Sequence, residues 1–158
     1  MKTRREWLAA AAAGAALAVV APRDAFARAA SATALRKPLM RIRKNPGCGC
    51  CDKWEDHLKA LGFETTVVED PKLYEYKQSL GVPRELVSCH TGVVEGYVVE
   101  GHVPGDLVQR MLKDKPKIAG IGVGGMPMGS PGMEGNRKDP YDVVAFRKDG
   151  TMMVYARR

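Results

Sequence analysis

The sequence has no apolar segment long enough to cross a membrane comfortably, and no basic stretch in which aromatic residues are interleaved. Its longest apolar run, from Leu8 to Ala21, is shorter than the roughly 20 residues that a membrane-spanning helix needs. The formal net charge is +7, but the lysines and arginines are scattered and aromatic residues make up only 6% of the chain. We therefore predict no nucleic-acid partner and no membrane span in the mature protein. The chain also has no internal repeat.

Residues 1–27 are typical of a secretory signal. Lys2, Arg4 and Arg5 form a positively charged start, an apolar run follows, and Ala25-Phe26-Ala27 fits the small-x-small cleavage pattern. The residues around the two arginines also resemble a twin-arginine signal, the class that exports folded proteins, and an ordinary secretory signal is the alternative. We expect an exported protein with a loose leader over residues 28–38 and one domain over residues 39–158.

Only four cysteines occur, and three of them lie within Cys48-Gly49-Cys50-Cys51. An exported protein can form disulfides, and the comfortable local pair is Cys48–Cys51, because the adjacent pair and the Cys48–Cys50 pair have poor geometry. Three crowded thiols at a strand-to-helix turn have two chemical uses, which are thiol–disulfide exchange and the binding of a soft metal. Cys50 is an additional thiol that a simple redox motif does not need.

The hydrophobic pattern predicts an α/β fold with a thioredoxin-like core, a Gly/Met-rich loop and an additional C-terminal β-hairpin. In thioredoxin-like folds the first βα turn carries the cysteines, and the loop entering the third strand, here Ser88-Cys89-His90-Thr91, faces them. The expected segments are strands 39–43 and 63–68, helices 51–61, 70–80 and 107–112, a hairpin over 93–99, a glycine-rich stretch over 119–136, and a final hairpin formed by 141–146 and 152–155. We expect the second helix to begin with Asp70 as its N-cap and Pro71 as its first residue.

The topology predicts that Cys89 and His90 lie opposite the first three cysteines, with His102 as a further candidate ligand just before the third helix. His57 lies about two helical turns past Cys50, too far away to join a compact site directly, and is interpreted as a partly exposed helix residue. Thiolate, imidazole and thioether ligands together favour copper, especially Cu(I). The thioethers belong to Met126, Met128 and Met133, in a loop that has neither helical nor strand periodicity. The alternative interpretation is that these methionines cover an apolar patch and bind no metal.

These motifs together resemble the CopG-like periplasmic proteins of bacterial copper-resistance operons, long described as a domain of unknown function. The matching stretches are Pro46–Cys51, Gly81–Pro83, Ser88–Thr91, Glu100–Pro104, Gly125–Pro127 and Gly129–Glu134. The resemblance implies a thioredoxin-like core that holds a multinuclear copper cluster bridged by cysteine sulfur, with Cu(I)/Cu(II) redox handling. It implies the metal ligands Cys48, Cys50, Cys51, Cys89, His90, His102, Met126 and Met133. Met128 occupies a variable position of the motif and is not included.

The leading hypothesis is a periplasmic copper-binding protein that acts in copper resistance by sequestration or by copper redox handling. Its expected partners are several copper ions and other periplasmic copper-handling proteins. Two alternatives stay open, a thiol–disulfide oxidoreductase that uses Cys48 and Cys51 and a copper carrier without redox chemistry. Whether the protein is a copper oxidoreductase enzyme is left open by the sequence.

Overall fold

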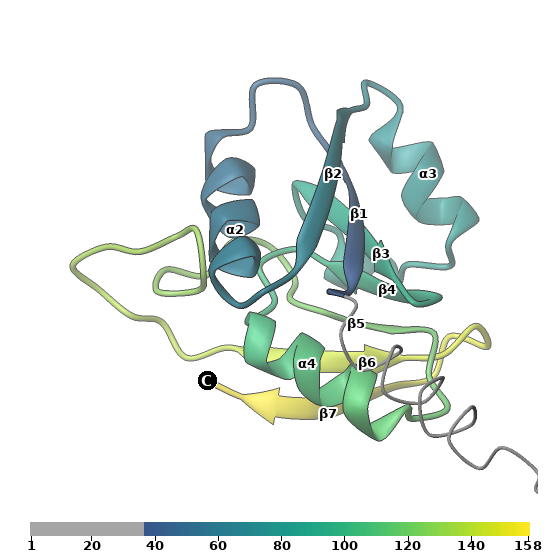
Figure 1. Cartoon of the computed structure of the whole chain (residues 1–158). Coiled ribbons are helices and arrows are strands. Elements are labelled where there is room, and N and C mark those ends of the chain that lie inside the picture. Colours follow the sequence, from purple (N-terminus) through teal and green to yellow (C-terminus); the bar gives the residue numbers. More distant parts are fainter. Residues whose placement is uncertain (1–36) are drawn as a thin grey trace, which may run out of the picture. The chain divides into compact units, whose positions relative to one another are not determined.

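The computed structural model describes residues 37–158, which have a mixed α/β fold (Figure 1). The predicted signal, 1–27, and residues 28–36 of the predicted leader lie outside the described residues. In chain order the elements are β1 Leu39–Lys44, α2 Gly49–Ala60, β2 Glu64–Glu69, α3 Leu73–Ser79, the 3-10 helix η1 Arg84–Leu86, β3 His90–Val94, β4 Tyr97–Glu100, α4 Gly105–Asp114, β5 Gly120–Gly122, β6 Asp142–Phe146 and β7 Met152–Arg157. Within this part of the chain, no helix combines the length and the apolar character needed to cross a membrane.

The strands form one seven-stranded sheet in the order β2-β1-β3-β4-β5-β6-β7. β1 pairs parallel with β2 and antiparallel with β3, so the ends of β1 and β3 that carry the cysteine loops lie side by side. β3 and β4 form the predicted hairpin. Its turn residues, Glu95 and Gly96, both have positive φ, 46° and 86°, as tight hairpin turns require.

Helices cover both faces of the sheet, and the alternation of side chains along β4 separates two hydrophobic clusters. Val99 packs in the larger cluster with Trp54 of α2 and Val108 of α4, whereas its neighbour Val98 packs in a smaller cluster with Phe146. Figure 1 shows α2 and α3 on opposite sides of β1 and β2. The apolar stripe of α2 therefore fixes that helix against the sheet and holds its N-terminal turn above the end of β1.

The predicted α/β fold and the C-terminal hairpin are confirmed, and the predicted elements from the first strand to the third helix occur in the expected order. The first helix begins at Gly49 instead of Cys51, so Cys50 and Cys51 both lie in its first turn and Cys48 is its N-cap residue.

The predicted start of the second helix is wrong, because α3 begins at Leu73 with Lys72 as N-cap. Asp70 instead closes a separate turn. Its carboxylate accepts the Lys72 N–H at 2.9 Å, and its carbonyl accepts the Leu73 N–H at 3.1 Å. The same carboxylate pairs with Arg43, which keeps it at the turn.

The glycine-rich stretch 119–136 was predicted without regular structure, but it contains the short strand β5. A Cβ on Gly120 would lie 2.1 Å from the carbonyl oxygen of Val98 on β4. Glycine is therefore needed for the close approach of the two strands. A strand of three residues, two of them glycine, has no hydrophobic alternation from which it could be predicted.

Candidate metal centre

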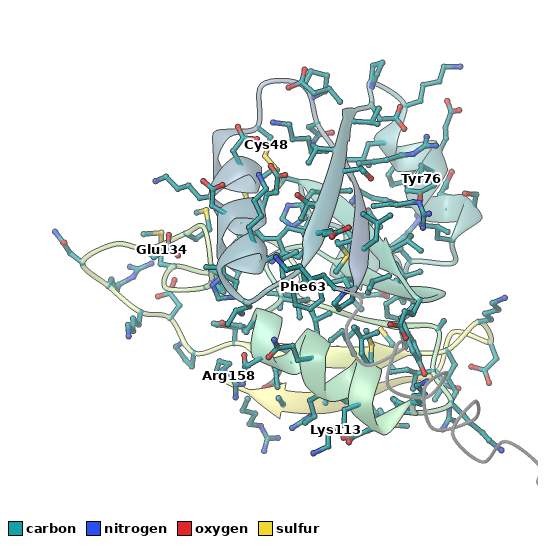
Figure 2. All side chains as sticks on the ribbon, viewed as in Figure 1. Cys48, Phe63, Tyr76, Lys113, Glu134 and Arg158 are labelled. Carbon is teal, nitrogen blue, oxygen red and sulfur yellow. A yellow bond between two sulfur atoms is a disulfide. The ribbon has the colours of Figure 1, made fainter. Side chains whose placement is uncertain are left out.

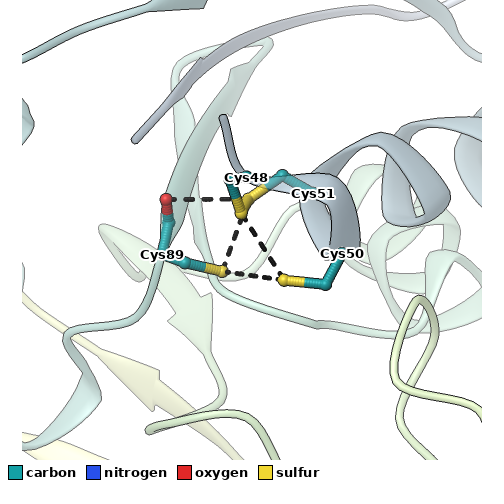
Figure 3. Close-up of side chains that lie close together, drawn as sticks. All are labelled: Cys48, Cys50, Cys51 and Cys89. Atoms are coloured by element: carbon teal, nitrogen blue, oxygen red, sulfur yellow. Dashed lines mark hydrogen bonds between the residues drawn. A yellow bond between two sulfur atoms is a disulfide. The ribbon is translucent and has the colours of Figure 1, made fainter. Parts of the chain in front are cut away.

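The four cysteine sulfurs meet where the N-terminus of α2 faces the residue before β3 (Figure 3). Cys50 and Cys51 come from the first turn of α2, Cys48 is its N-cap residue, and Cys89 comes from the segment that faces them. The Sγ–Sγ distances are 3.5 Å for Cys48–Cys50, 3.8 Å for Cys50–Cys89 and 3.4 Å for Cys51–Cys89. A metal–sulfur bond is about 2.3 Å long, so two sulfurs on one tetrahedral ion lie roughly 3.8 Å apart. The spacing of these sulfurs therefore suits shared metal ions.

Two of the cysteines are joined, because Cys48 and Cys51 form a disulfide across a Cα–Cα distance of 5.4 Å. This is the pair that chain geometry favours. Cys50 and Cys89 are free thiols. Only thiolates act as strong metal ligands, so the disulfide has to be reduced before all four sulfurs can bind metal.

The Cys89 thiol is held in its neutral form when no metal is present. Burial, followed by the charge and the hydrogen bond of Cys50, raises the pKa of Cys89 from 9.0 to about 11. A cation that binds this sulfur must displace its proton, so metal uptake at Cys89 releases a proton near neutral pH.

His102 is oriented to present a lone pair to the same sulfur. Its Nε2 atom lies 3.2 Å from Cys89 Sγ, and its Nδ1 atom lies 2.9 Å from the carbonyl oxygen of Pro131. A carbonyl only accepts, so Nδ1 carries the proton and Nε2 is free to bind a metal. Burial lowers the pKa of His102, which favours the neutral imidazole that metals bind.

His90 is fully buried and has an unpartnered ring nitrogen. Its Nδ1 atom lies 3.4 Å from Cys89 Sγ, while Nε2 has no hydrogen-bond partner. The ring stacks on Trp54 with centroids 4.2 Å apart and meets His102 edge-on at 4.9 Å. Burial lowers the pKa of His90 well below its usual value. A buried polar atom without a hydrogen-bond partner lowers the free energy of unfolding by about 1–3 kcal/mol, so the imidazole at this position reduces the stability of the metal-free fold.

Cys89 belongs to two groups of donor atoms at once. One group is formed by the four cysteines and the other by Cys89, His90 and His102, and within each group the ligand atoms lie within 4.8 Å of one another. The structure thus brings together six of the eight residues that were predicted as metal ligands, and Cys89 belongs to both groups.

The glycine- and methionine-rich loop is tied to the site at both ends of its methionine motif. Ser88 Oγ donates to the Gly125 carbonyl at 2.6 Å, next to Met126 in the sequence. At the other end a Cβ on Gly132 would lie 2.6 Å from the carbonyl oxygen of Cys50, so the backbone before Met133 packs directly on the cysteine turn. Figure 2 shows Glu134 on the loop beside α2. Met126 is 51% exposed and Met133 is half-buried, and their metal binding stays a prediction.

A buried ion pair that the sequence did not suggest supports the Cys89 loop. Lys77 Nζ lies 2.5 Å from Glu100 Oε1 and donates to Thr91 Oγ1 at 2.7 Å. The same carboxylate oxygen accepts the backbone N–H of Ser88 at 2.8 Å. Burial lowers the pKa of Lys77 and raises that of Glu100, while their mutual contact favours the charged forms. The pair therefore holds the residues on both sides of Cys89 and His90.

His57 is half-buried, as its helical position suggested, but it also has a structural partner. Its Nε2 atom accepts the backbone N–H of Gly105 at 3.0 Å and so connects α2 to the start of α4. The contact requires a neutral ring, and burial lowers the pKa of His57. His57 lies outside both groups of donor atoms.

Two structures of the protein titled "Copper resistance protein copG", Form 1 and Form 2, are similar to this chain. Each is 40% identical in sequence with a TM-score of 0.74, and the matches cover 78% of this chain and 98% and 99% of the respective structures. The chain belongs to the CopG family of copper resistance proteins.

A family model described as "Protein of unknown function, DUF411" matches residues 86–133. No curated protein matches the chain. The matched segment begins in η1 and ends at Met133, so it contains Cys89, both imidazoles of the site and the methionine motif. The predicted resemblance to CopG is thereby confirmed.

Proposed function

We propose that this CopG-family protein is exported to the periplasm and binds several Cu(I) ions in copper resistance. The main support is that the Cys89 sulfur belongs both to a group of four cysteines and to a group formed with His90 and His102. A thiolate has several lone pairs and can bridge ions, so Cys89 is placed to join a sulfur-rich position to a histidine-rich position. The name of the similar structures, copper resistance protein, agrees with copper as the metal.

The donor set selects a soft metal. Reduction of the disulfide presents four thiolates, and two neutral imidazoles flank them, which suits Cu(I). The mixture of thiolate and imidazole also lets the site tolerate Cu(II), so sequestration and Cu(I)/Cu(II) redox handling are both open to it. Met126 and Met133 cap outer ions in this proposal, because the loop that carries them is anchored at Ser88 and at the cysteine turn.

A second function is favoured by the Cys48–Cys51 disulfide, which has the spacing of a thiol–disulfide oxidoreductase. In that case Cys48 is the nucleophile and Cys51 the resolving thiol, and the protein needs neither Cys50 nor the histidines. Cys50 and two imidazoles converge on the Cys89 sulfur, an arrangement that a Cys48–Cys51 dithiol does not need, and for this reason we prefer the copper proposal.

The substitution Cys50→Ser distinguishes the two functions. A copper centre loses capacity, because serine is a poor ligand for a soft ion, whereas a dithiol enzyme retains its disulfide reductase activity. We expect lower copper content and weak reductase activity in the variant. Full copper loading together with strong insulin reduction would instead support the oxidoreductase.

A further inference from the structure

The four sulfurs of the centre are chemically unequal although they lie within contact distance of one another. Cys48 and Cys51 are neighbours on one helical turn and are joined, while Cys50 and Cys89 are thiols at 3.5 Å from Cys48 and 3.4 Å from Cys51, respectively. Figure 3 shows all four sulfurs pointing to the same point between α2 and the chain that carries Cys89. A pair of cysteines that can form a disulfide among metal-binding thiols stores two electrons at the metal site when it is in its reduced, dithiol form.

We propose that Cys48 and Cys51 supply the two electrons that reduce two Cu(II) ions, while Cys50, Cys89 and the two imidazoles retain the Cu(I) product. This inference rests on the proposed copper function and assigns separate roles to the cysteines of that site. It makes the protein a stoichiometric Cu(II) reductase whose reductant is its own dithiol.

The step balances without a further oxidant. Each Cu(II) accepts one electron, the Cys48 and Cys51 thiols lose their protons, and a bond forms between the two sulfurs. The products are two Cu(I), two protons and the Cys48–Cys51 disulfide. Regeneration needs an external dithiol. Cys51 is 2% exposed and Cys48 is more accessible, so the incoming thiolate attacks Cys48 and Cys51 leaves as a thiolate.

The contacts around Cys50 and Cys89 explain why these two sulfurs stay reduced. Cys89 Sγ has both imidazoles within 3.4 Å, so a Cu(I) ion on this sulfur finds nitrogen ligands already oriented toward it. Cys50 lies 3.8 Å from Cys89 and completes a retained site with one thiolate from α2 and one from the facing segment. The Cys48–Cys51 pair has no imidazole partner of this kind.

Disulfide formation also changes the capacity of the centre. It withdraws two of the four thiolates, so the oxidised protein holds fewer Cu(I) ions than the reduced protein. When Cu(II) is reduced and the disulfide forms, the protein therefore releases those Cu(I) ions for which no thiolate or imidazole ligand remains.

The test adds two equivalents of Cu(II) to fully reduced mature protein without oxygen. Cu(I) is measured with a chromogenic Cu(I)-specific chelator, free thiols are counted by alkylation, and the disulfide is located by peptide mapping. We expect two Cu(I), two remaining thiols and a single Cys48–Cys51 disulfide. Retention of all four thiols, or a disulfide that includes Cys50 or Cys89, would overturn the inference.

Matched variants separate the two roles. Cys48→Ser/Cys51→Ser should reduce Cu(II) at least tenfold more slowly, and Cys50→Ser should retain less Cu(I). His57→Gln, a change outside both donor groups, should match the wild type in rate and in retained Cu(I). Equal rates in the double variant and the wild type would refute the dithiol as electron source. Loading the reduced wild type with Cu(I) alone tests the proposed function by itself. A protein that binds several Cu(I) ions but loses no thiols to Cu(II) leaves the copper function standing and removes this inference.

Discussion

Cys89 Sγ lies 3.2 Å from His102 Nε2, and the other nitrogen of that ring is held by the carbonyl oxygen of Pro131. The tautomer that the carbonyl imposes points a lone pair toward the sulfur. The cysteine just before β3 and the histidine of the β4–α4 connection thus have their donor atoms together, and a loop residue 29 positions after the histidine fixes its ring.

The first prediction concerns this imidazole. The substitution His102→Ala should lower Cu(I) affinity at least tenfold, because it removes a nitrogen that is already oriented toward the shared sulfur. The measurement is competition with a Cu(I) chelator of known affinity. His57→Gln is the matched control, since His57 lies outside both donor groups, and it should leave affinity unchanged. Equal affinities for the His102→Ala variant and the wild type would exclude His102 as a ligand.

The second prediction concerns the buried ion pair. Lys77→Met leaves Glu100 charged and unpaired in the interior and should destabilise the metal-free protein by about 3–5 kcal/mol in urea unfolding. The double variant Lys77→Met/Glu100→Gln should recover part of this loss, because no buried charge remains.

The control for the ion pair is Lys59→Met, which removes an exposed partner of Glu55 on the same protein. It should change stability little, as exposed ion pairs generally do. If Lys77→Met is no more harmful than Lys59→Met, the ion pair does not hold the Cys89 loop.

The third prediction is a pH dependence that arises at His57. Its folded-state pKa is lowered from the usual 6.5, chiefly by burial, so the unfolded chain takes up the proton first as pH falls. The stability contributed by neutral His57 is present above about pH 6.5 and is lost below it.

Melting temperatures of the metal-free protein from pH 7.5 to 5.5 provide the measurement. His90 and His102 shift in the same direction, so the wild type loses stability through several groups. His57→Gln keeps an acceptor for the Gly105 N–H without the titration, and its melting temperature should fall less steeply with acid. Parallel pH profiles would show that His57 does not contribute.

These contacts also show how far the sequence could be interpreted. The Cys48–Cys51 spacing and the element order were sufficient to place Cys89 opposite the cluster, and the 3.4 Å Cys51–Cys89 distance agrees. Both depend on local spacing and on strand order, which hydrophobic patterns reveal. His90 and His102 followed from the same topology together with the family resemblance.

The supporting contacts were not predictable for a different reason. Lys77 lies four residues after Leu73, on the buried face of α3, but lysine is rarely buried, so its residue type gave no sign of its pairing with Glu100. The Pro131–His102 bond and strand β5 depend on how an irregular, glycine-rich segment folds back on the sheet. Such long-range backbone contacts leave no periodic signal in the sequence.

The fourth prediction concerns the methionine loop. Copper binding by Met126 and Met133 should increase hydrogen-exchange protection over residues 122–136, because glycine-rich backbone has much conformational entropy to lose when it is ordered. The double change Met126→Leu/Met133→Leu keeps apolar volume and removes sulfur, so copper affinity should fall while metal-free stability barely changes. Unchanged protection, or a large loss of metal-free stability, would assign both side chains to packing.

The number of Cu(I) ions bound per chain is the most direct test of the copper centre. The mature protein is fully reduced and titrated with Cu(I) without oxygen against a chelator of known affinity, and the thiols are counted in the same sample. Because Cys89 is shared by two donor groups, we predict saturation above one Cu(I) per chain with little competition from zinc. Saturation at one ion or fewer in a sample with four free thiols would contradict the multinuclear copper site.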